Sequence, residues 1–192
     1  ACISNDNTFE LNPKLSEEIN YNSFLPLINF FKKKGVKRFI NASSSSVYGF
    51  SDNPDVTEEH PLLPLTLYNK FKGLCEPILF EHHSNNFICV NVRPATICGC
   101  SPRMRFDLSV NILTNLAIRK KEVTVFGGKQ MRANLHINDM CNFYEFLLEA
   151  DAKLVGNKTF NISDENISIE NIALKIKNIF KKNYNLEIVI KK

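Results

Sequence analysis

The chain has 192 residues, of which 44% are hydrophobic and 23% are charged, and its formal net charge at pH 7 is +4. This length and composition are ordinary for a globular chain with one sizeable core, or with one domain and a small lobe. The lysines are scattered and not clustered with aromatic residues, which argues against a nucleic-acid partner, and the longest apolar runs are too short to cross a membrane.

The first half of the chain alternates between helix and strand patterns. Apolar side chains recur at helical spacing over residues 23–34, and Ser23 can cap this predicted helix. Residues 36–42 form an apolar run that predicts a buried strand. A polar loop with three prolines follows over residues 51–64, and a second helix is predicted over residues 66–82.

The same alternation continues to the C-terminus. Strands are predicted over residues 87–92, 123–126, 159–162 and 186–190, and helices over residues 108–119, from Asp139 and from Ser168. Pro94 should end the first of these strands, because proline cannot pair within a central ladder. Strands that alternate with helices predict an α/β fold with a mainly parallel sheet. Composition changes near Cys98, so we place a boundary between residues 98 and 99.

The six cysteines include no C-x-x-C pair. Cys98 and Cys100 stand too close together for a zinc-ligand pair, and no suitably spaced histidines accompany them. Cys89 lies in an apolar run and is interpreted as a small core residue. We therefore predict no metal site and expect reduced cysteines in a cytoplasmic protein.

Tyr68 and Lys72 stand four residues apart on the second predicted helix, so they share one face. A nearby ammonium favours the phenolate and brings a tyrosine, whose pKa is ordinarily near 10, closer to service as a general base. The spacing alone is a weak signal, because many surface helices carry it by chance.

Four serines, Ser43 to Ser46, follow the strand predicted over residues 36–42 and precede Val-Tyr-Gly. In open α/β sheets, ligands bind outside the carboxyl ends of the strands, so hydroxyls at this place can hydrogen-bond a substrate oxygen. For this segment taken alone, a plain polar turn is the alternative interpretation.

In this order, the strand, the serines, V-Y-G, the proline-bearing loop and Y-x-x-x-K resemble the extended short-chain dehydrogenase/reductase class, and within it the NAD-dependent sugar-nucleotide epimerases and dehydratases. Three later segments are similar to the R-P-x-x-x-x-G, G-x-x-x-R-x-x-x-H-x-x-D and F-N-[VI] motifs of that family: Arg93 to Gly99, Gly128 to Asp139, and Phe160 to Ile162. The resemblance covers nearly all 192 residues.

The resemblance implies a partial Rossmann-type parallel sheet with helices on both faces, plus a small C-terminal substrate-binding α/β lobe. Residues 1–98 would form the C-terminal half of an NAD-binding Rossmann domain. Residues 99–192 would form mainly the substrate-binding lobe, with segments that return to the Rossmann sheet.

The resemblance also implies roles for five residues around the cofactor. Tyr68 would be the general base and acid, and Lys72 would hold the nicotinamide ribose and lower the Tyr68 pKa. Ser44 would hydrogen-bond the reacting oxygen of the substrate. Ser43 and Pro94 would line the cofactor.

A second set of residues is implied to bind the nucleotide-linked sugar. Arg132 would clamp the diphosphate, for which a guanidinium fork is well suited. Asn111 and Phe126 are weaker matches to residues around the nucleotide. His136 and Asp139 are interpreted as structural, with Asp139 as a helix cap, and Arg93 receives no role.

The sequence departs from the family pattern at two places. The 4,6-dehydratases of the family follow the catalytic hydroxyl with Asp-Glu, whereas this chain has Ser45 and Ser46, which favours an epimerase or a simple reductase. The seven glycines form no G-x-x-G-x-x-G pyrophosphate loop, and no acidic residue for the adenosine ribose follows one. By resemblance, Ala1 lies just past the fourth family strand, so the chain is expected to be the C-terminal part of such a protein.

Three functions stay open from the sequence. The leading hypothesis is an NAD-dependent epimerase that transiently oxidises a hydroxyl of a nucleotide-linked sugar, at C4. The alternatives are an NAD(P)-dependent reductase of a keto-sugar or another carbonyl, and a non-catalytic truncated remnant. The expected partners are a nucleotide-sugar substrate and, from the family, a second copy of the chain, with no nucleic acid and no membrane.

Overall fold

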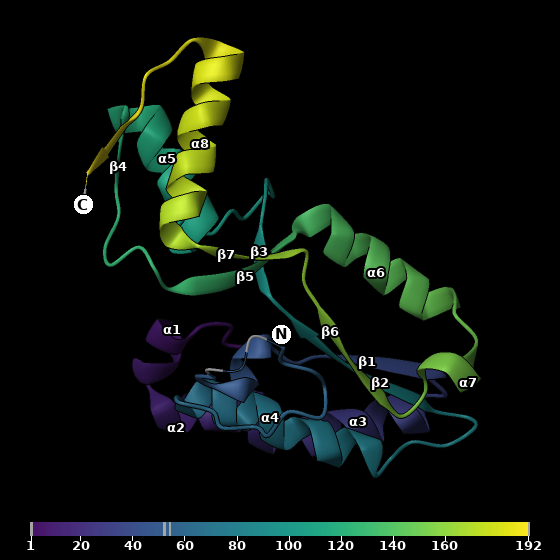
Figure 1. Cartoon of the computed structure of the whole chain (residues 1–192). Helices are drawn as coiled ribbons and strands as arrows, with labels where there is room; N and C mark the ends of the chain where they lie inside the picture. The colour runs from purple at the N-terminus through teal and green to yellow at the C-terminus, as the bar shows by residue number, and fades with distance from the viewer. Residues whose placement is uncertain (1, 52, 54, 192) are drawn as a thin grey trace. The chain divides into compact units, whose positions relative to one another are not determined.

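A computed structural model describes residues 2–51, 53 and 55–191 (Figure 1). The chain divides into two compact units. The first comprises Ala1–Ala95 with Phe143–Ile162, and the second comprises Thr96–Asn142 with Ser163–Lys192. The chain thus passes between the two units three times, after Ala95, after Asn142 and after Ile162, and neither unit is one continuous segment.

The described part of the first unit contains a parallel sheet of three strands in the order β1-β2-β6. The strands are β1 (Arg38–Ala42), β2 (Ile88–Pro94) and β6 (Lys158–Ile162). Val92 of the central strand pairs with Ala42 on one side and with Phe160 on the other. The carboxyl ends of these strands therefore meet at one edge of the sheet, and β1 ends immediately before the serine run.

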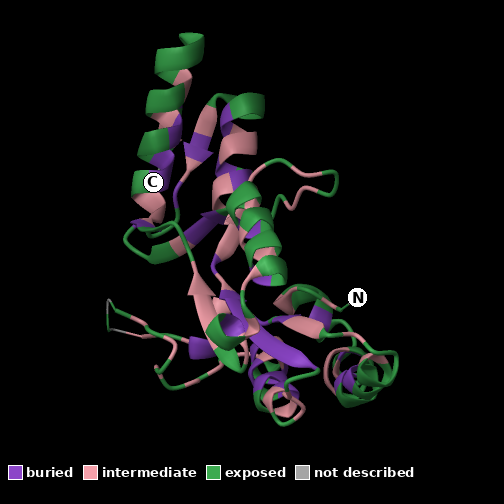
Figure 2. Cartoon of the chain, turned by 90° about the vertical axis from the view of Figure 1, so that its right-hand side faces the viewer, coloured by how far each residue is buried: buried purple, intermediate pink, exposed green. Residues whose placement is uncertain are grey.

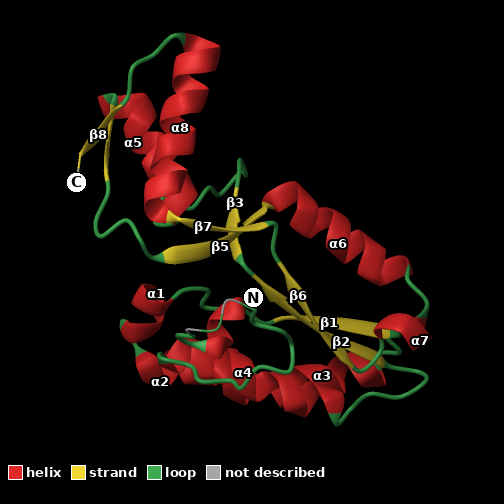
Figure 3. Ribbon diagram, viewed as in Figure 1, coloured by secondary structure: helices red, strands yellow, loops and turns green. Residues whose placement is uncertain are grey.

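Helices cover both faces of this sheet (Figure 3). The first unit contains α1 (Asp6–Glu10), α2 (Pro13–Glu17), a π-helical turn (Glu18–Asn22), α3 (Phe24–Lys33), the 3₁₀ turn η2 (Ser45–Tyr48), α4 (Leu67–Phe80), the end of α6 (Ile137–Glu149) and α7 (Ala152–Val155). Phe39 of β1 packs against Phe24 of α3, whereas Arg38 donates to the carbonyls of Leu147 and Ala150 near the end of α6. Successive strand side chains point to opposite faces, so α3 and α6 lie on opposite sides.

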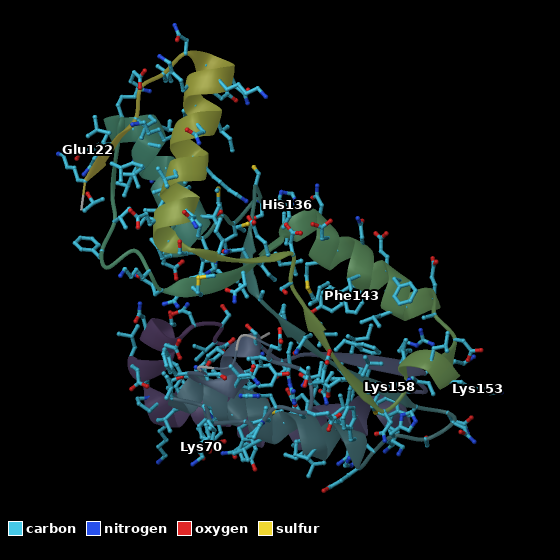
Figure 4. The ribbon with its side chains drawn as sticks, in the orientation of Figure 1. Lys70, Glu122, His136, Phe143, Lys153 and Lys158 are labelled. Atoms are coloured by element: carbon cyan, nitrogen blue, oxygen red, sulfur yellow. The ribbon has the colours of Figure 1, made fainter. Side chains whose placement is uncertain are left out.

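The core of the first unit forms where α3 and α4 meet β2. Ile28, Leu79 and Cys89 are fully buried there, together with Phe87. On the other face, Phe143 of α6, labelled in Figure 4, meets Phe160 of β6 edge to face with ring centroids 6.1 Å apart. This packing on both faces fixes the sheet edge that carries the serines.

The second unit is built around two smaller sheets. β5 (Met131–His136) pairs parallel with β3 (Thr96–Cys98) and antiparallel with β7 (Glu165–Ser168), while β4 (Glu122–Thr124) pairs parallel with β8 (Val189–Lys191). Between α5 (Ser109–Lys120) and α8 (Ile169–Tyr184), buried side chains such as Leu113, Ala117 and Ile176 form its core (Figure 2). Ser168 caps α8 by accepting from the Asn171 amide, as predicted.

Several expectations about element ends were wrong. Ser23 is already helical and its hydroxyl donates to the Ile19 carbonyl, so it does not cap α3. The strand β2 does end at Pro94, two residues beyond the predicted range, and Pro94 still pairs with Ile162 of β6. The strand β1 has already ended on the other side, so Pro94 costs no ladder bond there. The helix α6 begins at Ile137, so Asp139 lies in its first turn and not at its cap.

Within the described residues, no helix is both long enough and apolar enough to span a membrane. Among the same residues, no three His, Cys, Asp or Glu side chains gather as metal ligands would.

Candidate active site

The helix α4 carries the tyrosine and the lysine and starts at a well-defined cap. Thr66 Oγ1 accepts from the Asn69 amide at 3.2 Å and donates to Asp6 Oδ1 at 2.5 Å. Tyr68 and Lys72 then lie on one face of the first turns, and Lys72 Nζ lies 5.8 Å from the centre of the Tyr68 ring. Lys70, labelled in Figure 4, is exposed and points from α4 away from the sheet.

The Lys72 ammonium is fixed at the end of β1. It donates to the carbonyl oxygen of Ala42 at 2.6 Å, and Cys2 Sγ lies 3.9 Å from it. The Tyr68 ring is half-buried and meets Phe9 edge to face, with centroids 6.3 Å apart. The contact with Ala42 therefore places the ammonium at the sheet edge where parallel α/β sheets bind their ligands.

The serine run folds back onto α4. Ser44 has an extended backbone and caps the turn η2, accepting from the Ser46 amide at 3.2 Å. The hydroxyls of Ser44 and Ser46 lie 2.6 Å apart, and Ser46 Oγ donates to Asn69 Oδ1 at 2.6 Å. Asn69 follows Tyr68 directly in the chain. The structure thus connects Ser44 to the helix of Tyr68 through one hydroxyl and one amide.

Ser43 and Pro94 lie at the carboxyl ends of neighbouring strands. The Ser43 side chain is buried, and its hydroxyl donates to Glu76 Oε1 at 2.5 Å. Pro94 is half-buried and is the last residue of β2. Both positions flank the sheet edge described above, and their contact with a cofactor stays a prediction.

A buried ion pair between Arg93 and Glu76 was missed by the sequence reasoning. Their side chains are only 7% and 5% exposed, and they are joined by two bonds, Nε to Oε1 at 3.0 Å and Nη2 to Oε2 at 2.5 Å. Burial alone would lower the pKa of the Arg93 guanidinium, but hydrogen bonds with Glu76 and Tyr48 raise it, so the group stays charged. The pair joins β2 to α4.

The ion pair is the centre of a wider set of hydrogen bonds, here called the Arg93 network. Arg93 Nη1 donates to Tyr48 Oη at 2.6 Å and to the Glu58 carbonyl at 3.0 Å. Tyr48 Oη donates to Asn161 Oδ1 at 2.7 Å, and Glu58 Oε1 accepts from the Asn161 amide at 2.7 Å. The members of the Arg93 network are Ser43, Tyr48, Glu58, Glu76, Arg93 and Asn161.

One signal in the sequence pointed to this network. Asn91 and Arg93 stand two apart in the otherwise apolar strand β2, so both point to the same face. Both are buried, and Asn91 Nδ2 donates to the Glu76 carbonyl at 3.4 Å and accepts, through Oδ1, from Asn41 at 2.8 Å. A buried charge requires a partner, which the pattern of one strand cannot identify.

In the second unit, Arg132 and Phe126 are exposed. Arg132 lies on β5, and its guanidinium donates to the carbonyl of the preceding Met131 at 2.9 Å. Phe126 is 79% exposed on the loop after β4, where Gln130 Nε2 donates to its carbonyl at 2.7 Å. Their contact with a substrate stays a prediction.

Asn111 has a different environment from these two. It is 5% exposed, its Oδ1 accepts from the Gly99 amide at 3.2 Å, and its Nδ2 donates to the Arg105 carbonyl at 2.9 Å. Its amide therefore holds the loop between β3 and α5. Gly99 has φ of +120°, and a Cβ there would lie 2.9 Å from His136 Nε2, so His136 packs against this loop.

Comparison with known proteins places the chain in a family. The model of the NAD dependent epimerase/dehydratase family matches residues 1–163. The chain belongs to this family. The Rossmann-type expectation is confirmed by the parallel sheet with helices on both faces and by the fold of solved family members.

This chain matches only part of the length of its relatives in the epimerase/dehydratase family. The putative UDP-arabinose 4-epimerase 2 of Arabidopsis thaliana is 26% identical over 149 residues, which are 67% of this chain and 35% of that protein. The UDP-glucose 4-epimerase of Bacillus subtilis (strain 168) is 27% identical over 154 residues, 71% of this chain and 45% of that protein. The chain thus spans less than half the length of these two relatives.

A solved structure in the same family has a closely similar fold. The crystal structure of UDP-glucuronic acid 4-epimerase from Bacillus cereus, in complex with UDP-glucuronic acid and NAD, matches with a TM-score of 0.79 and 26% identity. The match covers 100% of this chain and 60% of that one.

Proposed function

We propose that the protein is an NAD-dependent epimerase that acts on a nucleotide-linked sugar by transient oxidation of its C4 hydroxyl. The observation that carries the proposal is the position of Lys72, whose ammonium lies 2.6 Å from the Ala42 carbonyl and 5.8 Å from the centre of the Tyr68 ring. A base and a cation at the carboxyl end of a parallel sheet suit proton transfer beside a bound dinucleotide.

The donors at this edge fit a nicotinamide ribose. An ammonium has three donors, and Lys72 directs one to the Ala42 carbonyl and one to Cys2 Sγ, which leaves one for a ribose hydroxyl. We assign this contact to Lys72 and Tyr68, with Ser43 and Pro94 lining the same edge. The bound cofactor supplies the hydride acceptor and donor that the reaction requires.

The protein side chains then have separate parts in the chemistry. Tyr68 takes the proton from the C4 hydroxyl and returns it to the same oxygen after the sugar has presented its other face. Ser44 donates a hydrogen bond to that oxygen and stabilises the charge that develops on it. The hydride removed from C4 is returned to C4 on the other face and the proton is returned to the oxygen, so the overall reaction has no net redox change.

The second unit is proposed to bind the nucleotide end of the substrate. Arg132 offers a guanidinium fork to the diphosphate, a charge-assisted contact that suits this anion. Phe126 offers an exposed ring for stacking, and Asn111 acts through the loop that it holds. Epimerisation is favoured over 4,6-elimination because Ser45 and Ser46 stand where the dehydratases carry an additional acid and base.

The proposal is tested by incubating the full gene product with NAD and a panel of UDP-, GDP- and dTDP-sugars. We expect interconversion of one C4 epimer pair without accumulation of NADH. Consumption of NADPH coupled to formation of a reduced product would select the reductase instead. An absence of any conversion across the panel would contradict the proposal.

A further inference from the structure

The Arg93 network connects every segment that carries a proposed catalytic side chain in the first unit. Glu76 lies on α4, two turns after Tyr68 and one after Lys72, and it accepts from Ser43 and from Arg93. Ser43 precedes Ser44 directly. The carboxylate therefore joins the strand end that presents Ser44 to the helix that presents Tyr68.

The same guanidinium also fixes the segments that follow the serines. Through Tyr48 it holds the end of η2, and through the Glu58 carbonyl it holds the loop between η2 and α4. Asn161 on β6 closes the arrangement, since its Nδ2 donates to the Val56 carbonyl at 3.1 Å while its backbone amide donates to Glu58 Oε1. The loop is thus bonded to the sheet at two neighbouring residues.

We propose that Arg93 is a positioning residue for the reaction, because it sets the relative placement of Ser44 and Tyr68 through Glu76 and Tyr48. This inference rests on the proposed function. Arg93 needs no contact with substrate in this role. A displacement of about 1 Å between reacting groups can cost on the order of 100-fold in rate, so a network that fixes two catalytic segments has a measurable effect on turnover.

A buried ion pair such as that in the Arg93 network adds little net stability to a fold. Replacing a buried ion pair by apolar side chains of similar size is often neutral or stabilising, whereas leaving one charge unpaired is strongly destabilising. A fork of hydrogen bonds does provide fixed directions to Glu76, Tyr48 and the loop, which apolar packing does not. Geometry at the catalytic end of the sheet is therefore the property that the pair supplies.

The first test compares two tyrosine variants of the full gene product. Tyr48→Phe removes only the hydroxyl that bridges Arg93 and Asn161. Tyr21→Phe is the matched control, because Tyr21 also packs on an aromatic ring, at 5.2 Å from Phe71, and its hydroxyl makes no hydrogen bond among the described residues. We expect Tyr48→Phe to lower kcat about tenfold with KM for the nucleotide sugar changed less than about twofold, and Tyr21→Phe to change neither.

A second variant keeps the test informative if single charge deletions unfold the protein. Arg93→Met combined with Glu76→Leu removes both charges together and should fold, since neither charge is left unpaired. We expect kcat to fall about 100-fold while the protein stays folded, with a lower melting temperature because the buried Ser43 hydroxyl loses its acceptor. Parent-like kcat in both the double variant and Tyr48→Phe would overturn the inference.

Tyr68→Phe, measured beside them, separates the two proposals. Under the proposed function it loses on the order of 100-fold or more in turnover, because the acid–base group is gone. If Tyr68→Phe is inactive while Tyr48→Phe and the double variant both keep parent-like kcat, only the role of Arg93 fails. If Tyr68→Phe retains full turnover, the proposed function fails.

Discussion

The candidate residues of the first unit and those of the second unit are held in different ways. In the first unit, Ser43 and Ser44 are bonded to other side chains, and the Lys72 ammonium is bonded to a backbone carbonyl. In the second unit, the only hydrogen bond of the Arg132 guanidinium among the described residues is to the neighbouring Met131 carbonyl, and Phe126 is 79% exposed. Asn111 is the exception, since both ends of its amide hold a loop.

This difference matches the two proposed tasks. Proton and hydride transfer require atoms to be placed before the substrate arrives, so the cost of ordering them is met by folding. Recognition of a large, flexible nucleotide sugar tolerates side chains that become ordered on binding. Substitutions of the hydrogen-bonded residues in the first unit should therefore change kcat, and substitutions of the exposed residues in the second unit should change KM.

The largest effect is expected from Lys72. Lys72→Met should lower turnover by on the order of 100-fold or more, because the ammonium beside Tyr68 and Ala42 is lost. Lys70→Met is the matched control on the same helix, since Lys70 is exposed and points away from the site. Steady-state assays of the full gene product check this, and equal losses in the two variants would contradict a specific role for Lys72.

Arg132 tests the other half of the comparison. Arg132→Met should raise KM for the nucleotide sugar about 10- to 100-fold and change kcat far less, because a charge-assisted hydrogen bond is worth about 1.5–3 kcal/mol. Arg119→Met is a control in the same unit, as Arg119 is an exposed residue in the last turn of α5. A fall in kcat with KM unchanged would place Arg132 with the chemistry instead.

Substitutions of Asn111 and Phe126 should have different effects on the free energy of unfolding. Asn111→Ala removes the two hydrogen bonds that join α5 to the loop, with the Gly99 amide and the Arg105 carbonyl, so we expect a loss of about 1–3 kcal/mol in the free energy of unfolding. Phe126→Ala removes an exposed ring and should change it by less than about 0.5 kcal/mol. Urea denaturation checks both values, and a larger loss for Phe126→Ala would show that its ring is structural.

The smallest effect concerns the cysteines. Burial raises the pKa of the Cys75 thiol to about 12, against a smaller opposing effect of Lys72, and burial raises that of Cys89 to about 11. Both stay protonated at pH 8, where the reactive thiolate is scarce. Brief treatment of the native protein with iodoacetamide should therefore label the exposed Cys2, Cys100 and Cys141 first. Equal labelling of Cys75 on mass-spectrometric mapping would contradict its burial.

The parts of the site that were predictable from sequence are local ones. Tyr68 and Lys72 share a face because helical periodicity places residues four apart together, and α4 begins after Thr66, at the start of the range predicted for this helix. Ser44 lies at the end of β1 because the apolar run ends there. The roles assigned to these residues stay predictions.

The parts that were not predictable depend on long-range pairing. Arg93 on β2 forms its ion pair with Glu76 on α4, and β5 pairs with β3 and β7, which come from distant segments of the chain. Short strands such as β3 carry too few residues for alternation to show. Leu27 is one of the apolar side chains at helical spacing within residues 23–34, yet it is exposed, because periodicity identifies an apolar face without showing which part of that face is covered.

The alternation of the two units along the chain also sets an order of events during synthesis. Arg93 and Glu76 leave the ribosome together, but Asn161 follows only after the whole segment from Thr96 to Asn142 has been made. At about 5–20 residues per second, that interval lasts several seconds. During it β2 lacks its β6 neighbour, and the second unit in turn is completed only after Ser163–Lys192 has been made, because α8 supplies part of its core.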